Sequence, residues 1–240
     1  MSMSVSSVMH IRRNQPTRLE SFVDSAFAFA ITLIVISVGH VPDTVADMLN
    51  ALRDIPAFAV CFLLIARIWK SHRNWSRTYD LDDNATVWLS LLLVFVVLIY
   101  VYPLRILFSA MFGTFGHGWL SSQAHVVRSY FELRAAYVVF GIGYATIWGI
   151  FVLLYRHALK AQGTIGLSRA ETEATRFHIA LNLGFAVVAV LSIALAVSLP
   201  FETTPQTVAL PGIIYFAMAP LSIGLSRYWR RHIAALAHDA

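Results

Sequence analysis

The chain has 240 residues, of which 58% are hydrophobic and only 13% are charged, and its mean hydropathy is +0.67. These values exclude an ordinary soluble domain, in which about 25% of residues are charged. The net charge of +5 does not indicate a nucleic-acid-binding protein, because the basic residues lie at the ends of apolar runs and not on one amphipathic stripe. The composition predicts an all-α integral membrane protein.

Six apolar runs approach the roughly 20 residues that a helix needs to cross a bilayer. They are continuous and not alternating, which favours helices over the strands of a β-barrel. We expect one six-span domain over residues 1–240, with spans at 19–39, 52–69, 86–110, 135–155, 177–199 and 211–228. The longest connection, residues 112–134, is a candidate for a short external helix. Ser168 and Glu171 have the S-x-x-E spacing of a capping box and predict the start of the fifth helix.

The basic residues divide unequally between the two ends of these spans. Fourteen of the 18 fall on the side that holds both termini, and the other four are Arg53, Arg105, Arg128 and Arg134. Because positively charged short loops stay in the cytoplasm, both termini are predicted to be cytoplasmic. We expect a multi-pass protein of the cell (inner) membrane.

The first apolar run, residues 22–38, is interrupted by one carboxylate, Asp24. An unpartnered acid at membrane depth costs about 2.5–3.5 kcal/mol, so Asp24 needs a partner and marks a candidate functional site. At 100° per residue, other side chains of this helix fall on one narrow stripe: Phe22, Ala26, Phe29, Leu33, Ile36 and His40. Ser25 and Thr32 flank this stripe. Asp24 lies about 140° from Phe29 and cannot line the same surface. Ordinary helix packing would also produce such a stripe.

The segment Arg18-Leu-Glu-Ser-Phe-Val-Asp24, followed by Ala28-Phe-Ala-Ile-Thr-Leu33, resembles a known signature. It is similar to the R-x-x-x-F-S-D motif that opens bacterial members of the transmembrane protein 175 family of endosomal and lysosomal potassium channels. Further matches are Trp69 and His72 at the end of the second run, Trp88-Leu-Ser90 in the third, and Tyr102-Pro103 at its exit. Length and six-span layout agree over nearly the whole chain.

The resemblance implies a potassium-permeable cation channel in which a homotetramer surrounds a central pore lined by the first helix of each subunit. The family narrows its pore with apolar rings, which map here to Phe29, Leu33 and Ile36, with Thr32 alongside. The resemblance also implies a structural or gating network near the cytoplasmic ends of the first two spans, formed by Arg18, Phe22, Asp24, Trp69 and His72. Two positions depart from the family pattern: Val23 replaces a serine, and Phe29 stands where isoleucine is usual. Four phenylalanine rings would close the pore more completely or change its selectivity.

The expected partners are membrane lipid, potassium and other monovalent cations or protons, and no nucleic acid. We expect no cofactor beyond the permeant potassium ion, no metal site and no enzyme activity, because P-loop, zinc-binding and nucleophile-elbow motifs are missing from the sequence. The alternative is a secondary transporter that uses Asp24 as a coupling acid, although such proteins usually carry paired repeats and several intramembrane ionisable residues. A non-conducting scaffold fits the composition but explains neither the stripe nor Asp24.

Overall fold

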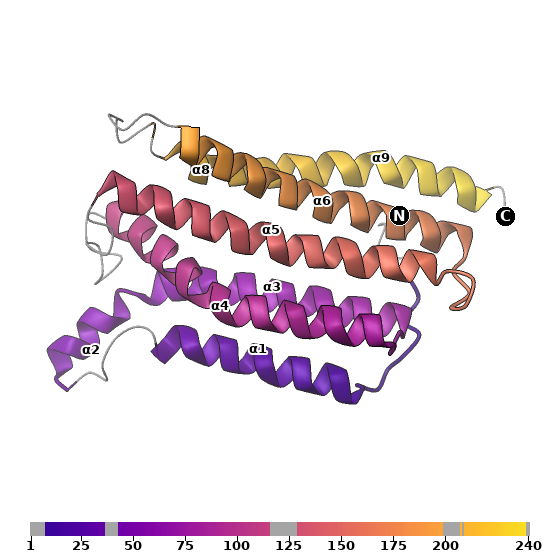
Figure 1. Cartoon of the computed structure of the whole chain (residues 1–240), viewed down its shortest axis with the longest axis horizontal. Helices are drawn as coiled ribbons and strands as arrows, with labels where there is room; N and C mark the ends of the chain where they lie inside the picture. Colours follow the sequence, from indigo (N-terminus) through magenta and orange to yellow (C-terminus); the bar gives the residue numbers. More distant parts are fainter. Residues whose placement is uncertain (1–7, 37–42, 116–128, 199–206, 208, 239–240) are drawn as a thin grey trace.

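The computed structural model describes residues 8–36, 43–115, 129–198, 207 and 209–238, and it contains no strand within those ranges. Six helical segments are long and apolar enough to cross a membrane (Figure 1). The prediction of an all-α, six-span membrane protein is therefore confirmed. The chain is a multi-pass membrane protein.

The spans follow the predicted order, but several of their ends differ from the predicted apolar limits. The helix of the second span continues to Tyr79, whereas its predicted end was residue 69. The helix of the fifth span begins eight residues before its predicted start at residue 177. The spans are α1 (Arg18–Ile36), α3 (Ile55–Tyr79), α4 (Asn84–Phe115), α5 (Tyr130–Lys160), α6 (Arg169–Ser198) and a last span made of α8 (Leu210–Ile213), the 3₁₀ turn η2 (Ile214–Ala217) and α9 (Met218–His238). Within the predicted loop 112–134, both ends are helical and residues 116–128 lie outside the described part of the chain.

A short helix, α2 (Val45–Leu52), precedes α3 and was missed by hydropathy, which placed residue 52 at the start of the second span. The Thr44 side chain accepts from the Asp47 amide and so caps the first turn of α2. The membrane helix starts only at Ile55, with Pro56 in its first turn, where a missing amide proton costs nothing. The apolar residues of α2 therefore belong to a separate element.

The predicted capping box at the start of α6 is confirmed. The Glu171 amide donates to Ser168 Oγ at 3.2 Å, and the Ser168 amide donates to Glu171 Oε2 at 2.9 Å. The last span departs from regular α-helix geometry close to Pro220. Pro220 has no amide proton to give to the carbonyl of Phe216, and the 3₁₀ turn η2, which contains Phe216, ends at Ala217, in the turn before the proline.

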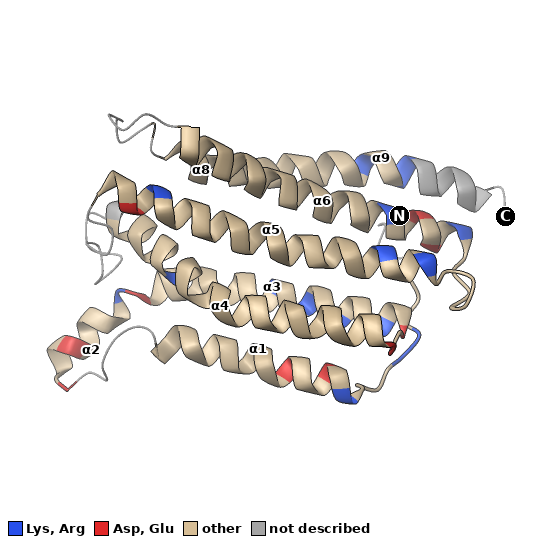
Figure 2. Ribbon diagram, in the orientation of Figure 1, with Lys and Arg blue, Asp and Glu red and all other residues tan. Residues whose placement is uncertain are grey.

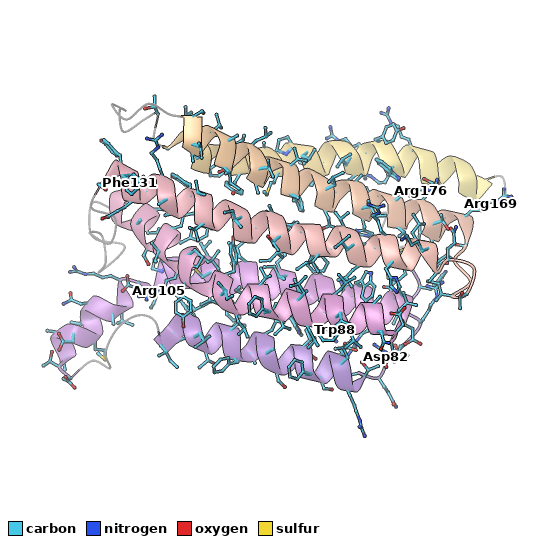
Figure 3. All side chains as sticks on the ribbon, in the orientation of Figure 1. Asp82, Trp88, Arg105, Phe131, Arg169 and Arg176 are labelled. Carbon is cyan, nitrogen blue, oxygen red and sulfur yellow. The ribbon has the colours of Figure 1, made fainter. Side chains whose placement is uncertain are left out.

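The first helix lies at one edge of the bundle, where it packs against α3 and α4, as Figure 1 shows. The chain of packing continues from α4 to α5, from α5 to α6 and from α6 to α9. Basic side chains gather at the end of the bundle where α1 begins and α3 and α5 end (Figure 2). Arg169 and Arg176 lie at this end and Arg105 toward the other (Figure 3). The start of α1 and the end of α9 share this end, as an even number of spans requires.

Candidate functional site

The first helix has one buried and one uncovered face. Its buried side chains recur every three or four residues and are Glu20, Val23, Phe27, Ala30 and Ile34. This spacing places them on the face that packs against α3 and α4. Val23, one of the two departures from the family pattern, is 0% exposed, so it does not change the uncovered face.

The four predicted pore-lining residues lie on or beside the uncovered face. Phe29 is 55% exposed and Ile36 is 64% exposed, and Thr32 is exposed between them. Leu33 is half-buried at the edge of this face, where it packs against the core. The structure thus brings Phe29, Thr32 and Ile36 onto one surface that no other part of the described chain covers.

Hydroxyl groups on this face have a defined orientation. The Thr32 hydroxyl donates to the Ala28 carbonyl at 3.0 Å, and the Ser25 hydroxyl donates to the Ser21 carbonyl at 2.9 Å. Because each hydroxyl proton is used within the helix, the oxygen lone pairs are what remains for an outside partner. Oxygen lone pairs suit a hard cation, so the uncovered face is apolar with two cation-compatible oxygens.

Asp24 is half-buried beside α3 and faces away from Phe29, as the helical spacing predicted. The indole N–H of Trp69 donates to Asp24 Oδ1 at 2.7 Å. The guanidinium of Arg73, one turn further along α3, lies 5.6 Å from the centre of the Trp69 ring. Asp24 therefore accepts a hydrogen bond from Trp69, whose ring also lies close to the positive charge of Arg73. These contacts supply the partner that a carboxylate in an apolar setting requires.

The other three members of the predicted network make no side-chain hydrogen bond to Asp24 in the described part of the chain. His72 is buried and shares a 2.9 Å hydrogen bond with Ser90 Oγ, so it joins α3 to α4 and does not contact Asp24 by a hydrogen bond. Arg18 and Phe22 are exposed at the start of α1. Of the five predicted network residues, the structure joins Asp24 and Trp69 directly.

A second acid on α1 is more deeply buried than Asp24. Glu20 is 1% exposed, and its two oxygens accept from Arg77 Nε at 2.8 Å and from Arg13 Nη2 at 3.3 Å. Arg13 also contacts Asp80 Oδ1 at 3.0 Å and donates to Ser76 Oγ at 2.8 Å. The cluster holds two cations and two anions and is neutral.

The N-terminal strap, which we define as residues 8–17, lies across the same end of the bundle. The amides of Arg12 and Arg13 both donate to the Arg77 carbonyl, at 3.0 and 3.2 Å. Arg12 Nη2 contacts both oxygens of Glu171, at 3.0 and 3.1 Å. Thr17 then caps α1 by accepting from the Glu20 amide at 3.1 Å.

Arg12, Arg13 and Arg77 are three of the fourteen basic residues that predicted the topology, and Glu20 was not among the predicted site residues. One local signal was available, since Thr17 and Glu20 have the T-x-x-E spacing of a capping box. Local spacing does not reveal that Glu20 turns toward two arginines from other segments. In the described part of the chain, no three His, Cys, Asp or Glu side chains are grouped as metal ligands would be.

Comparison with known proteins identifies the same family over most of the chain. A family model for the endosomal/lysosomal potassium channel TMEM175 matches residues 18–102, which include α1, α3 and the first half of α4. A protein of Marivirga tractuosa named potassium channel is 33% identical over 232 residues, covering 95% of this chain and 93% of that protein. A protein of Streptomyces collinus, also named potassium channel, is 27% identical over 207 residues, covering 84% of this chain and 90% of its own.

Solved structures agree with the fold. The crystal structure of a variant of the potassium channel MtTMEM175, bound to a nanobody–MBP fusion, matches with a TM-score of 0.78 and 33% identity over 92% of this chain and 96% of that one. A lysosomal potassium-selective channel TMEM175 homologue from Chamaesiphon minutus matches with a TM-score of 0.53 and 20% identity over 85% of this chain and 96% of its own, which shows the fold alone. The chain belongs to the TMEM175 family of endosomal/lysosomal potassium channels.

Proposed function

We propose that four copies of this chain form a potassium-permeable cation channel in the cell (inner) membrane. The observation that carries the proposal is the uncovered face of α1, in a chain whose relatives are named potassium channels. An edge helix with such a face supplies one wall of a pore, and several copies are needed to close a ring. Potassium, and other monovalent cations or protons, would pass through the pore with no cofactor bound, and lipid would cover the outer surface.

Phe29, Leu33 and Ile36 are proposed to form successive apolar rings along this pore, with Thr32 beside them. Hydrophobic constrictions gate by dewetting, so an apolar lining is compatible with conduction. The hydroxyl geometry supports cation preference, because Thr32 and Ser25 expose acceptor lone pairs and not protons. The transporter alternative is not favoured, since Asp24 is bonded to Trp69 on a different side of the helix.

Purified protein in liposomes with a potassium gradient tests the proposal. Phe29→Ala is expected to raise potassium flux about tenfold, which corresponds to a barrier lower by about 1.4 kcal/mol, because the widest apolar group of the constriction is removed. The matched control is Phe216→Ala, which removes a 79% exposed ring from the last span. Equal effects of the two substitutions, or flux that saturates and is strictly coupled to a second ion, would contradict the proposed pore.

The tetramer is tested separately by the mass of the assembly. Native mass spectrometry of the protein released from detergent is expected to give four times the chain mass of 26.8 kDa. A stable monomer or dimer that still conducts would refute the ring of four first helices.

A further inference from the structure

The N-terminal strap connects the outermost spans of the bundle to the start of α1. At one end, Val8 and Met9 pack against the buried pair Ala174 and Phe177 on α6, against which Trp229 of α9 also packs. At the other end, Thr17 caps the first turn of α1. The strap therefore joins the edge helix to α6, which α1 does not otherwise pack against closely.

The middle of the strap is held by an ion pair to α6. The Glu171 side chain is 3% exposed, and both of its oxygens face Arg12 Nη2. The Ser168 amide and, at 3.4 Å, the His10 amide also donate to this carboxylate. Arg12 Nη1 donates to the Thr78 carbonyl at 3.0 Å, so the guanidinium is held from two sides. Loss of either charge leaves the other one poorly compensated, so the strap position depends on both.

Attraction between the uncovered faces of α1 from different subunits would oppose the strap and draw the first helices together. In the proposed tetramer, Phe22, Phe29 and Ile36 of four subunits surround one axis, and closer approach would expel water from between these side chains. The contacts of α1 with α3 and α4 resist this approach along the helix. At the end where α1 begins, the strap adds a contact to α6.

We propose that the N-terminal strap is a tether that holds the basic end of α1 away from the pore axis, with Arg12 and Glu171 as its positioning residues. The proposal rests on the channel function proposed above. Release of the tether lets the four first helices approach one another and favours the closed pore. The lining side chains are unchanged, so the properties of the open pore stay the same.

Single-channel recording of the full chain in potassium solutions tests the tether. Arg12→Gln and Glu171→Gln are each expected to lower the open probability about fivefold or more. Glutamine at position 171 keeps the capping function of that residue, so the α6 start is preserved. The double variant is expected to be no worse than either single one, and the exchanged pair Arg12→Glu with Glu171→Arg is expected to recover part of the loss. Unitary conductance and the potassium-to-sodium permeability ratio are expected to stay at the wild-type values.

The matched control is Arg176→Gln. Arg176 lies near the same end of α6 (Figure 3) and pairs with Glu173 at 2.6 Å, but this pair is on one exposed helix face and does not involve the strap. Its removal is expected to leave the open probability unchanged.

Hydrogen exchange measures strap release without reference to conduction. The amides of Arg12 and Arg13, which donate to the Arg77 carbonyl, are expected to exchange faster in Arg12→Gln and Glu171→Gln than in the wild type. Faster exchange with an unchanged or raised open probability would overturn the tether, as would unchanged exchange. A wild-type protein that conducts no ion would refute the channel instead. In a protein that does not conduct, the tether would be tested by the hydrogen exchange of amides in the first two turns of α1. Unchanged protection of these amides after strap release would overturn it.

Discussion

Asp24 and Phe29 are five residues apart on α1 and lie on two different faces of the helix. Asp24 accepts from Trp69 on α3, whereas Phe29 is 55% exposed on the uncovered face. An ion in a pore lined by Phe29 would meet the Asp24 charge only through the helix. We therefore assign Asp24 to the position of α1 against α3 and not to contact with the permeant ion.

Substitutions at Asp24 and Trp69 are expected to affect stability in a defined order. Trp69→Phe leaves the carboxylate without its close donor and is expected to destabilise the assembly by about 2–3 kcal/mol. Asp24→Asn keeps an oxygen that accepts from the indole and removes the charge, so a smaller loss is expected, about 1 kcal/mol or less. Thermal unfolding of the detergent-solubilised assembly measures both.

Asp82→Ala serves as the control, because Asp82 is exposed in the turn between α3 and α4 (Figure 3). Its unfolding temperature is expected to match the wild type. In assembled Asp24→Asn channels the potassium-to-sodium permeability ratio is expected to stay unchanged. A strong change in that ratio would place Asp24 in the ion path and contradict the assignment.

At the scale of elements, α4 and α5 approach closely at Gly143. A β-carbon built at this glycine would lie 2.4 Å from Cδ2 of Tyr100, a ring that is 2% exposed and 5.4 Å from the Phe140 ring. The Tyr100 ring has little room to move aside, because the protein interior around it is tightly packed. The α4–α5 contact therefore depends on the absence of a side chain at Gly143.

Gly143→Ala is expected to destabilise the protein by about 1–3 kcal/mol through overpacking. Gly149→Ala on the same helix is the matched control, since its β-carbon would meet nothing within 4 Å. A change of no more than about 0.5 kcal/mol is expected there. Thermal or denaturant unfolding in detergent compares the two, and equal effects would show that the Tyr100 contact is not the cause.

The turn between α3 and α4 is joined to the end of α5 by Asp83. One oxygen of Asp83 accepts from the Thr86 amide at 2.9 Å, and the other lies 2.7 Å from His157 Nε2. Burial alone would raise the pKa of Asp83, but these two partners outweigh it and hold the pKa below its usual value. A lowered folded-state pKa means that the ionised group stabilises the fold above the unfolded pKa of about 3.9, and that this contribution is lost as the pH falls through the folded pKa.

Asp83→Asn is accordingly expected to lower the unfolding temperature at pH 7. The stability difference from the wild type should not exceed about 1 kcal/mol, because the pair is solvent-exposed. The difference should shrink below about pH 3.9, since protonated aspartate and asparagine are both neutral. Unfolding temperatures of the two proteins measured across this pH range check the sign, and a difference that grew as the pH fell below about 3.9 would contradict it.

For the whole molecule, the charge distribution makes a prediction about orientation. The basic end of the bundle is expected to face the cytoplasm (Figure 2). Cysteine introduced at Asn84, the first residue of α4, should be protected from a membrane-impermeant maleimide in intact cells, and cysteine introduced at Asn50 in α2 should be labelled. Both positions are exposed, and both should be labelled once the membrane is permeabilised. Cys61→Ala provides the background, because Cys61 is the single cysteine of the chain. The reverse labelling pattern would invert the topology.

The spans and the stripe on α1 could be predicted because they depend on hydrophobicity and helical period, which are local properties. Trp69 was expected near Asp24 only from the resemblance to the family, since spacing does not reveal which distant side chain meets a carboxylate. The Glu20 cluster escaped prediction because Arg13 and Arg77 reach it from different segments. The short helix α2 escaped because its apolar residues merge with the following span in a hydropathy window.

The Arg12–Glu171 pair also imposes an order on biosynthesis. Its two residues are 159 positions apart, so α1 is synthesised and enters the membrane long before its partner on α6 exists. During that interval the uncovered face of α1 has lipid for a neighbour and no tether at its basic end. The anchored arrangement of the first helix is thus completed only when most of the chain has left the ribosome, which delays the mature position of α1 until five of the six spans have been made.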